Sequence, residues 1–196
     1  LIQSLSCLSA DASGDHKGDL QDVSFFTPRE AAKALLGLAH KYGTSLDCSV
    51  EHPHSLFGDV KLKDGCTVCG ACAGACPTGS LSVERDSDGL GLMFDPQLCI
   101  GCSECVPVCP EKVLSVERRT DLLRLSQGRV PLCRTSEAQC EVCGGPIAPQ
   151  QMLRKIIALL GSDPSISAIS GRCLSCRNFG LLESDKRERR DHDGTD

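Results

Sequence analysis

Two cysteine runs with the same spacing are the residues of this sequence best suited to chemistry. The run CTVCGACAGACP occupies residues 66–77, and CIGCSECVPVCP occupies residues 99–110. Both place four cysteines at gaps of two, two and three residues, and both end in proline. An iron–sulfur cubane takes one protein thiolate for each iron atom, so four thiolates must converge on one compact object. The spacing therefore predicts thiolate ligation of iron–sulfur clusters.

Two runs of this kind predict two [4Fe-4S] clusters whose ligands are exchanged between the runs. The two-residue gaps let a tight loop aim three sulfur atoms at one cluster, and the fourth cysteine, next to proline, completes the other cluster. We expect the first cluster to be bound by Cys66, Cys69, Cys72 and Cys109. We expect the second cluster to be bound by Cys99, Cys102, Cys105 and Cys76.

The segments around the runs form an internal repeat. Cys66 and Cys99 are 33 residues apart, and a strand-like segment precedes and follows each run. On the two runs and this repeat, residues 58–119 resemble the bacterial-type two-cluster ferredoxins. The resemblance implies an α+β domain with the ferredoxin-like βαββαβ fold, two cubanes related by a pseudo-twofold axis, and transfer of single electrons.

A structural zinc site or a disulfide region is the alternative for these eight cysteines. Two identical runs, followed by Pro77 and Pro110, argue against it. An enzyme acting on its own substrate at a cluster would need an iron atom with an open coordination position. Eight cysteines for two cubanes leave no such position, so we expect no catalytic residue.

Four further cysteines form two C-x-x-C pairs near the end of the chain. Cys140 and Cys143 are separated from Cys173 and Cys176 by 29 residues, with a helical stretch from Pro149 to Gly161 between them. The pattern resembles a zinc ribbon, and four thiolates from two turns suit one tetrahedral zinc ion. A third iron–sulfur cluster is the alternative, and the nearby Cys133 leaves the choice of ligands open. Met152, Ile156, Leu159 and Leu160 are expected to form an apolar face on the helix.

The order of these features predicts the domain organisation. Residues 1–57 form an N-terminal extension with one helix at about 28–41, residues 58–119 form the cluster domain, residues 133–180 form the C-terminal cysteine lobe, and residues 181–196 form a charged, disordered tail. Residues 120–132 are expected to be a link.

The helix of the N-terminal extension carries strong local signals. Thr27 is placed to cap it, Pro28 suits its first turn, Glu30 completes a capping box, and Gly43 suits its end. An apolar stripe is expected at Ala31, Leu35, Leu38 and Ala39.

Composition limits the remaining possibilities. The chain has 196 residues, 15 of them cysteine, and only 3% aromatic residues, which favours small domains held by metals. A net charge of −5 does not favour nucleic-acid binding. The chain contains no apolar stretch of 18 residues, so no membrane span is predicted. Cysteines in short-gap pairs favour a reducing compartment, so the cytoplasm is expected.

Three cysteines remain outside these patterns, namely Cys7, Cys48 and Cys133, and we interpret them as ordinary buried thiols.

The chain is thus predicted to be an electron-transfer subunit or domain of a multi-component oxidoreductase, working with a redox partner protein or a catalytic subunit. The alternative is a redox-sensing or assembly protein in which the clusters and the zinc lobe are structural.

Overall fold

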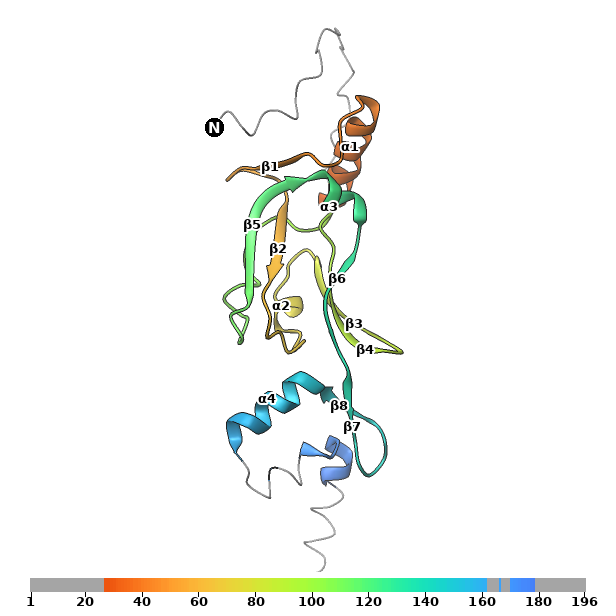
Figure 1. The fold of residues 1–196 in the computed structure, drawn as a ribbon, viewed down its shortest axis with the longest axis vertical. Coiled ribbons are helices and arrows are strands. Elements are labelled where there is room, and N and C mark those ends of the chain that lie inside the picture. The colour runs from red at the N-terminus through yellow and green to blue at the C-terminus, as the bar shows by residue number, and fades with distance from the viewer. Residues whose placement is uncertain (1–26, 162–165, 167–169, 179–196) are drawn as a thin grey trace, which may run out of the picture. The chain divides into compact units, whose positions relative to one another are not determined.

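The computed structural model describes residues 27–161, 166 and 170–178 (Figure 1). These divide into two compact units. The first contains the described residues up to Cys66 together with 70–83 and 92–132. The second contains residues 67–69 and 84–91 together with the described residues from Cys133 onward. Cys7 and the tail at 181–196 lie outside the described residues, as does part of the predicted C-terminal lobe.

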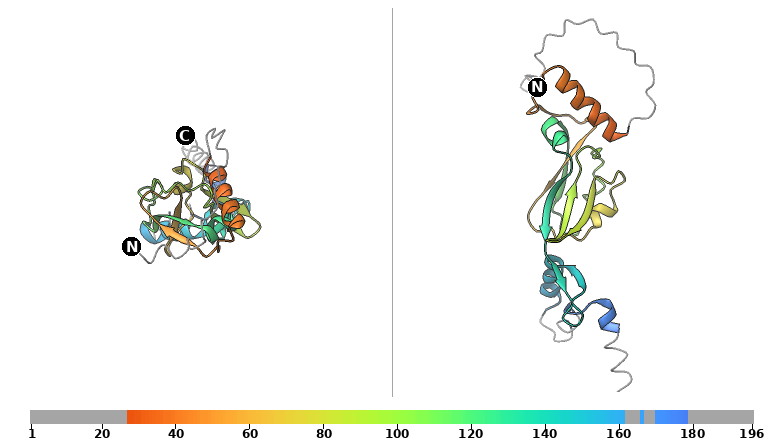
Figure 2. Two further views of the ribbon diagram at one scale, coloured as in Figure 1. Left: turned by 90° about the horizontal axis from the view of Figure 1, so that it is seen from above. Right: turned by 90° about the vertical axis from the view of Figure 1, so that its right-hand side faces the viewer.

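Helix α1 spans Pro28–Lys41 and begins as its sequence predicts (Figure 2). The Thr27 amide donates to Glu30 Oε2 at 2.8 Å, and the Glu30 amide donates to Thr27 Oγ1 at 3.3 Å. This reciprocal capping box satisfies two amide groups that a helix start otherwise leaves unpaired. Gly43 follows the C-terminal cap with a φ of +64°, a left-handed conformation that glycine adopts at low cost.

The buried face of α1 is shifted from the predicted stripe. Ala32 is fully buried against Phe57 and Leu125, and Ala39 is buried against Cys48 and Leu122. Leu38 is 52% exposed, so its place in the stripe was predicted wrongly. Small residues suit this buried face, because the two alanines allow the helix to lie close to the side chains that they contact.

Two three-stranded sheets are present in the described part of the chain. One has the order β1 (Ser49–Glu51), β5 (Leu114–Asp121) and β2 (Gly58–Leu62), with antiparallel pairing throughout. The other has the order β3 (Leu81–Asp86), β4 (Gly89–Phe94) and β6 (Val130–Thr135). The four strands expected on either side of the cysteine runs therefore form β2, β3, β4 and β5. Strand β2 leads into the first run and β5 follows the second, so their pairing joins the two halves of the repeat.

The helical turns within the repeat are short. Helix α2 spans Ala71–Gly74 in the first run. The second run has hydrogen-bonded turns instead, with the Val106 amide donating to the Ser103 carbonyl and the Cys109 amide donating to the Val106 carbonyl. The structure is thus a mixed α and β fold with small sheets.

Residues 120–132 are not the link that the sequence suggested. Helix α3 spans Leu122–Gln127, and the Asp121 carboxylate caps it by accepting from the Arg124 amide at 2.9 Å. Leu122 and Leu125 are both buried. Strand β6 then begins at Val130. The capping aspartate and the terminal Gly128 are the local signals that could have revealed this helix.

The C-terminal region contains a short hairpin and one helix. Strand β7 (Glu137–Gln139) pairs antiparallel with β8 (Pro146–Pro149), and a bulge lies between Ala138 and Gln139. Helix α4 spans Gln150–Leu160, and none of its described side chains is buried. Its residues Ile156 and Leu160 line a cavity, whereas Leu159 is 75% exposed.

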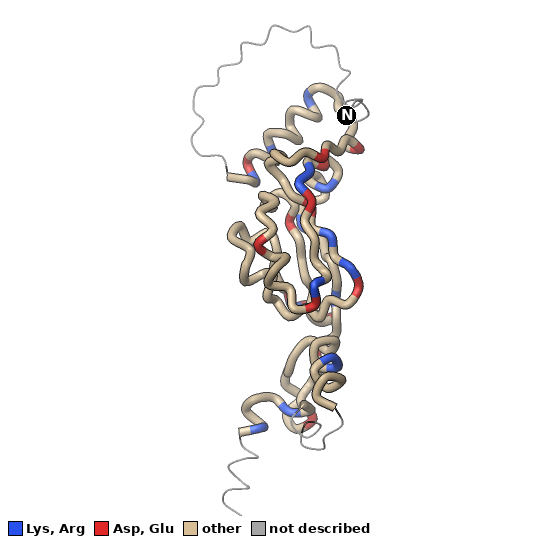
Figure 3. The backbone as a smooth tube through the Cα atoms, turned by 90° about the vertical axis from the view of Figure 1, so that its left-hand side faces the viewer, with Lys and Arg blue, Asp and Glu red and all other residues tan. Residues whose placement is uncertain are grey.

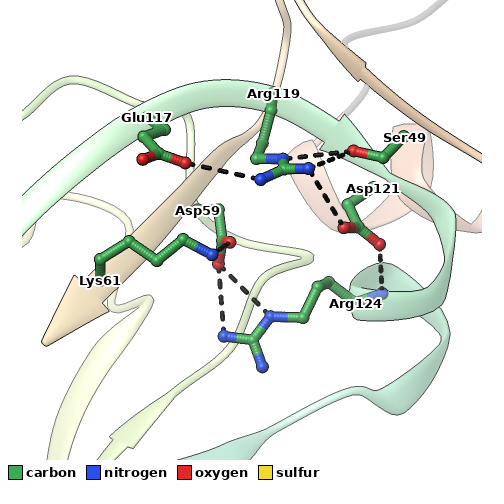
Figure 4. Close-up of polar contacts among 7 residues, drawn as sticks. All are labelled: Ser49, Asp59, Lys61, Glu117, Arg119, Asp121 and Arg124. Atoms are coloured by element: carbon green, nitrogen blue, oxygen red, sulfur yellow. Dashed lines mark hydrogen bonds and ion pairs between the residues drawn. The ribbon is translucent and has the colours of Figure 1, made fainter.

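A network of charged side chains ties the β1–β5–β2 sheet to α3 (Figure 4). The Asp59 side chain is 4% exposed, and its carboxylate contacts Lys61 Nζ at 2.5 Å and Arg124 Nη2 at 3.3 Å. Arg124 also lies over the ring of Phe94, with 5.9 Å between the guanidinium carbon and the ring centroid. A buried carboxylate must be paired, so Asp59 requires the helix to dock where Arg124 can reach it.

Replacing Asp59 tests this connection. Asp59→Asn removes the charge but keeps the shape, and it leaves Arg124 half-buried without its anion. We expect a loss of about 2 kcal/mol in the free energy of unfolding, measured by urea denaturation of anaerobic protein. The matched control is Glu117→Gln, which removes the more exposed partner of Arg119 and should cost less than about 0.5 kcal/mol. Equal losses in the two variants would contradict the assigned role of Asp59.

Candidate metal centres

One cavity in the first unit gathers four cysteines from both runs. Cys76 from the first run and Cys99, Cys102 and Cys105 from the second all line it. Val60 of β2 and Val116 of β5, which are directly opposite in the sheet, form part of its apolar wall. The chain thus brings the last cysteine of one run to the first three of the other. These four are the cysteines predicted for the second cluster, and their ligation of a cluster stays a prediction.

The thiols of this cavity oppose one another's ionisation. Burial, and then the neighbouring Cys99, raise the pKa of Cys105 to about 11. Burial also raises the pKa of Cys99, although the Gly101 amide and the Ser80 side chain act in the opposite direction. Four thiolates can share this space only if a cation compensates their charge. A cationic iron–sulfur core is such a cation, so the donor set fits a cubane.

Cys76 differs from the other thiols because backbone amides surround it. Burial acts to raise its pKa, but hydrogen bonds from the amides of Leu81, Thr78 and Ser80 and from the Thr78 side chain outweigh burial, so the pKa is lowered. The Cys76 sulfur and the Thr78 hydroxyl are 3.7 Å apart. Thr78 and Ser80 were not predicted as site residues, and their place shortly after the Cys-Pro step is the signal that could have identified them.

The cysteines expected to hold the first cluster have these positions. Cys66 is half-buried, Cys69 is exposed, Cys72 is buried in α2, and Cys109 is buried after the second run. Their common ligation of one cluster stays a prediction from the spacing. Cys48 is buried in the core beneath α1, and Cys133 is half-buried on β6.

The backbones of the two runs repeat the same unusual conformations. Val68 and Gly101 have φ values of +52° and +65°, and each lies just before the second cysteine of its run. Just after that cysteine, Gly70 and Ser103 have φ values of +80° and +65°. Further along, Gly79 and Lys112 have φ values of +66° and +54°.

These left-handed positions fall at equal places in the repeat even though glycine occupies only some of them. A side chain at such a position costs about 1–2 kcal/mol. Strained backbone is retained where the surrounding structure requires it, as at ligand-binding loops. We conclude that both runs adopt one loop conformation, and that this conformation is a property of the motif rather than of its glycines.

Gly58 allows the second run to approach the sheet. A Cβ atom at this position would lie 2.6 Å from the Gly101 Cα and 3.0 Å from the Cys99 sulfur, distances that a side chain cannot tolerate. The Gly58 amide also donates to the Cys99 carbonyl at 3.0 Å. The strand and the cysteine loop are therefore in direct backbone contact.

A second group of thiols lies in the C-terminal unit. The sulfur atoms of Cys140, Cys143, Cys173 and Cys176 all lie within 4.8 Å of one another. The Gly144 amide donates to the Cys140 carbonyl at 2.8 Å, and the Cys140 amide donates to the Gly145 carbonyl at 2.7 Å. Gly144 has a φ of +71°, which such a tight turn requires. The two predicted C-x-x-C pairs are thus brought together, and the group could bind a metal ion.

The protonation of this group is uneven. Amides of Cys173 and Cys143 donate to the Cys140 thiol and lower its pKa to about 6. Contacts with the side chains of Cys143 and Cys173 raise the pKa of Cys176 to about 12. The Cys143 and Cys173 sulfurs are only 3.6 Å apart. Mutual repulsion therefore keeps the group partly protonated, and a dication would relieve that repulsion.

Comparison with known proteins agrees with the first of these sites. Residues 65–113 match the family model described as a 4Fe-4S dicluster domain. A search of curated proteins found no match to the chain. The matched segment is therefore a 4Fe-4S domain, and such a domain implies iron–sulfur electron transfer. Within the described residues, no helix has both the length and the apolar character needed to cross a membrane.

The shared loop conformation predicts opposite effects for one pair of substitutions. Ser103→Gly relieves a left-handed side chain and should raise the free energy of unfolding by about 0.5–1 kcal/mol. Gly70→Ser introduces the same strain at the equivalent position and should lower it by a similar amount. A Cβ at Gly70 would lie 3.6 Å from Val83 Cγ2, an ordinary contact, so no clash confuses the comparison. Changes of the same sign in urea denaturation would refute the equivalence of the two loops.

Proposed function

We propose that this chain relays single electrons through two [4Fe-4S] clusters within a multi-component oxidoreductase. The single observation that carries the proposal is the cavity in which Cys76 joins Cys99, Cys102 and Cys105. We assign these four to one cluster and Cys66, Cys69, Cys72 and Cys109 to the other. The pairing of β2 with β5, and of β3 with β4, around the two runs supports the same assignment.

Several features favour a relay over catalysis on a bound substrate. The matched domain implies electron transfer, and the two four-cysteine ligand sets leave no iron atom open to a substrate. A relay needs a donor and an acceptor, so the partner is a redox protein or a catalytic oxidoreductase subunit. Cysteines paired at short gaps favour a reducing compartment, for which we propose the cytoplasm.

We assign the C-terminal group to one structural zinc ion. Four thiolates offered by two tight turns suit tetrahedral zinc, and such sites contribute directly to folding. The hairpin β7–β8 and the turn that carries Cys173 have few buried side chains, so a metal is the natural stabiliser of this small unit. A third iron–sulfur cluster at the same cysteines would instead lengthen the relay.

A redox-sensing or assembly role is the second candidate. The exposed side chains of α4 and Leu174 favour it, because they give the C-terminal unit an apolar surface suited to a partner. In that case the clusters would not turn over with a redox enzyme. Reversible reduction of the clusters, followed by rapid reoxidation by a partner enzyme, would favour the relay instead.

Metal and sulfide content of anaerobically purified protein tests the proposal directly. We expect about eight iron, eight sulfide and one zinc per chain. About twelve iron without zinc would replace the zinc ion by a third cluster. Little iron with two or more zinc would overturn the electron-transfer proposal.

Paired cysteine substitutions test the exchange of ligands between the runs. In the variant Cys76→Ala/Cys99→Ala both losses fall on one cluster, so about four iron atoms should remain. In Cys72→Ala/Cys76→Ala the losses fall on different clusters, so little iron should remain. If each run bound its own cluster, the two results would be reversed, which makes iron analysis of the pair decisive.

Zinc content separates the ligands of the C-terminal group from the nearby Cys133. Cys143→Ser should abolish zinc binding while the iron content stays at about eight. Cys133→Ser is the matched control and should retain the zinc, because Cys133 lies outside the group of four sulfurs. Zinc loss in the control alone would show that the ligands were assigned wrongly.

A further inference from the structure

An arginine of strand β5, Arg118, packs against the second cysteine run. Arg118 of β5 is paired with Gly58 of β2. This pair lies two residues along the strands from the pair Val60 and Val116, which lines the cysteine cavity. Side chains two positions apart on a strand share a face, so Arg118 lies on the same side of the sheet as the cavity. A Cβ atom on Gly101 would lie 3.0 Å from Arg118 Cγ and 3.6 Å from Arg118 Nε.

The positive charge of Arg118 has no anionic partner among the described residues. Its Nη1 donates to the carbonyl oxygen of Ser55 at 3.3 Å, which fixes the side chain without cancelling its charge. Gly101, which the side chain covers, lies between two proposed ligands, and its amide donates to the Cys99 thiol. The Arg118 side chain therefore packs on the residue that lies between two proposed ligands of the second cluster, Cys99 and Cys102.

The repeat supplies an equivalent arginine for the first cluster. Arg118 lies nine residues after Cys109, and Arg85 lies nine residues after Cys76. Arg85 is neutralised, because its Nη2 contacts Glu137 Oε1 at 2.6 Å. Glu137 belongs to β7, outside the repeat, and its side chain is 16% exposed, whereas that of Arg85 is 60% exposed. Residues 67–69 and 84–91 belong to the same compact unit as β7, so this ion pair lies in the unit that carries part of the first run.

We infer that Arg118 makes the two clusters electrostatically unequal and raises the reduction potential of the second relative to the first. The inference rests on the proposed function, since it requires both clusters. Reduction adds one electron to a cluster that four thiolates already make anionic, and a nearby cation stabilises that added charge. Arg118 acts in this way at the second cluster, whereas the Arg85–Glu137 pair has almost no net charge at the first. An electron entering the pair is therefore more stable on the second cluster.

One carboxylate of the second run has no counterpart in the first. Glu104 stands where the first run has Ala71. Glu104 and Arg118 are both exposed, so water weakens the field of each, but only Arg118 packs its side chain on Gly101, between Cys99 and Cys102. Figure 3 shows segments of lysine and arginine interspersed with segments of aspartate and glutamate along the described backbone.

An EPR-monitored redox titration of fully loaded protein tests the inference. Arg118→Gln should lower one of the two midpoint potentials, with a threefold to tenfold change in the one-electron equilibrium constant, tenfold being about 59 mV. Glu137→Gln should raise the other midpoint potential, because it uncovers the charge of Arg85. The double variant Arg85→Gln/Glu137→Gln removes the whole pair and is the matched control, in which both midpoint potentials should stay close to those of the unaltered protein.

Iron and sulfide are counted in every variant before titration, so the two proposals can fail separately. If the unaltered protein lacks two clusters, the proposed function fails. If two clusters are present but Arg118→Gln moves neither potential, or moves both equally, the inference is overturned while the proposed function stands. A shift of the same potential by Arg118→Gln and by Glu137→Gln would also overturn it.

Discussion

Mutual repulsion among four thiolates is the constraint on which the rest of this structure depends. Burial and neighbouring sulfurs raise the pKa of Cys105 to about 11, so the cavity does not hold four thiolates by itself. Two things can offset the repulsion, namely a cationic core and amide groups aimed at sulfur. The chain supplies amides at Cys76 and at Cys99, all from residues shortly after each cysteine. The positions of these residues therefore decide which amides reach each sulfur.

The β1–β5–β2 sheet holds the cysteine loops in place. Strand β2 precedes the first run and β5 follows the second, so the antiparallel pairing of these strands brings the start and the end of the repeat together. Gly58 then lets the Cys99–Gly101 segment rest directly on β2, where a side chain would force them apart. Asp59, the next residue, is buried and holds Arg124 of α3. One short strand thus contacts both the cysteine cavity, which Val60 lines, and α3, which Asp59 reaches through Arg124. Apolar and charged residues accordingly alternate along it.

Local signals predicted the elements whose information lies in neighbouring residues. The capping box at Thr27 and Glu30, the four strands around the runs and the convergence of the two C-x-x-C pairs all follow from short-range patterns. The sequence did not predict the exposure of Leu38, because which stripe of α1 is buried depends on where α3 packs. Left-handed backbone at Val68 and Lys112 was also unpredictable from residue type, since both residues disfavour it. The sequence does contain the signals for α3, in the capping Asp121 and the terminal Gly128, but the helix has only six residues and so shows no clear period.

A duplicated unit begins with two equivalent sites, so any difference between its clusters must come from substitutions within the repeat or from residues outside it. The segments LSVERD and LSVERR differ only at the last position, and both carry the arginine that follows its run by nine residues. Identical residues therefore have different electrostatic effects because only one meets Glu137, which β7 contributes from beyond the repeat. Since an ion pair has a much weaker field at a distance than a single charge, one carboxylate is enough to break the equivalence. The charge beside Arg85 is thus decided by a residue beyond the repeat and not by a substitution within it.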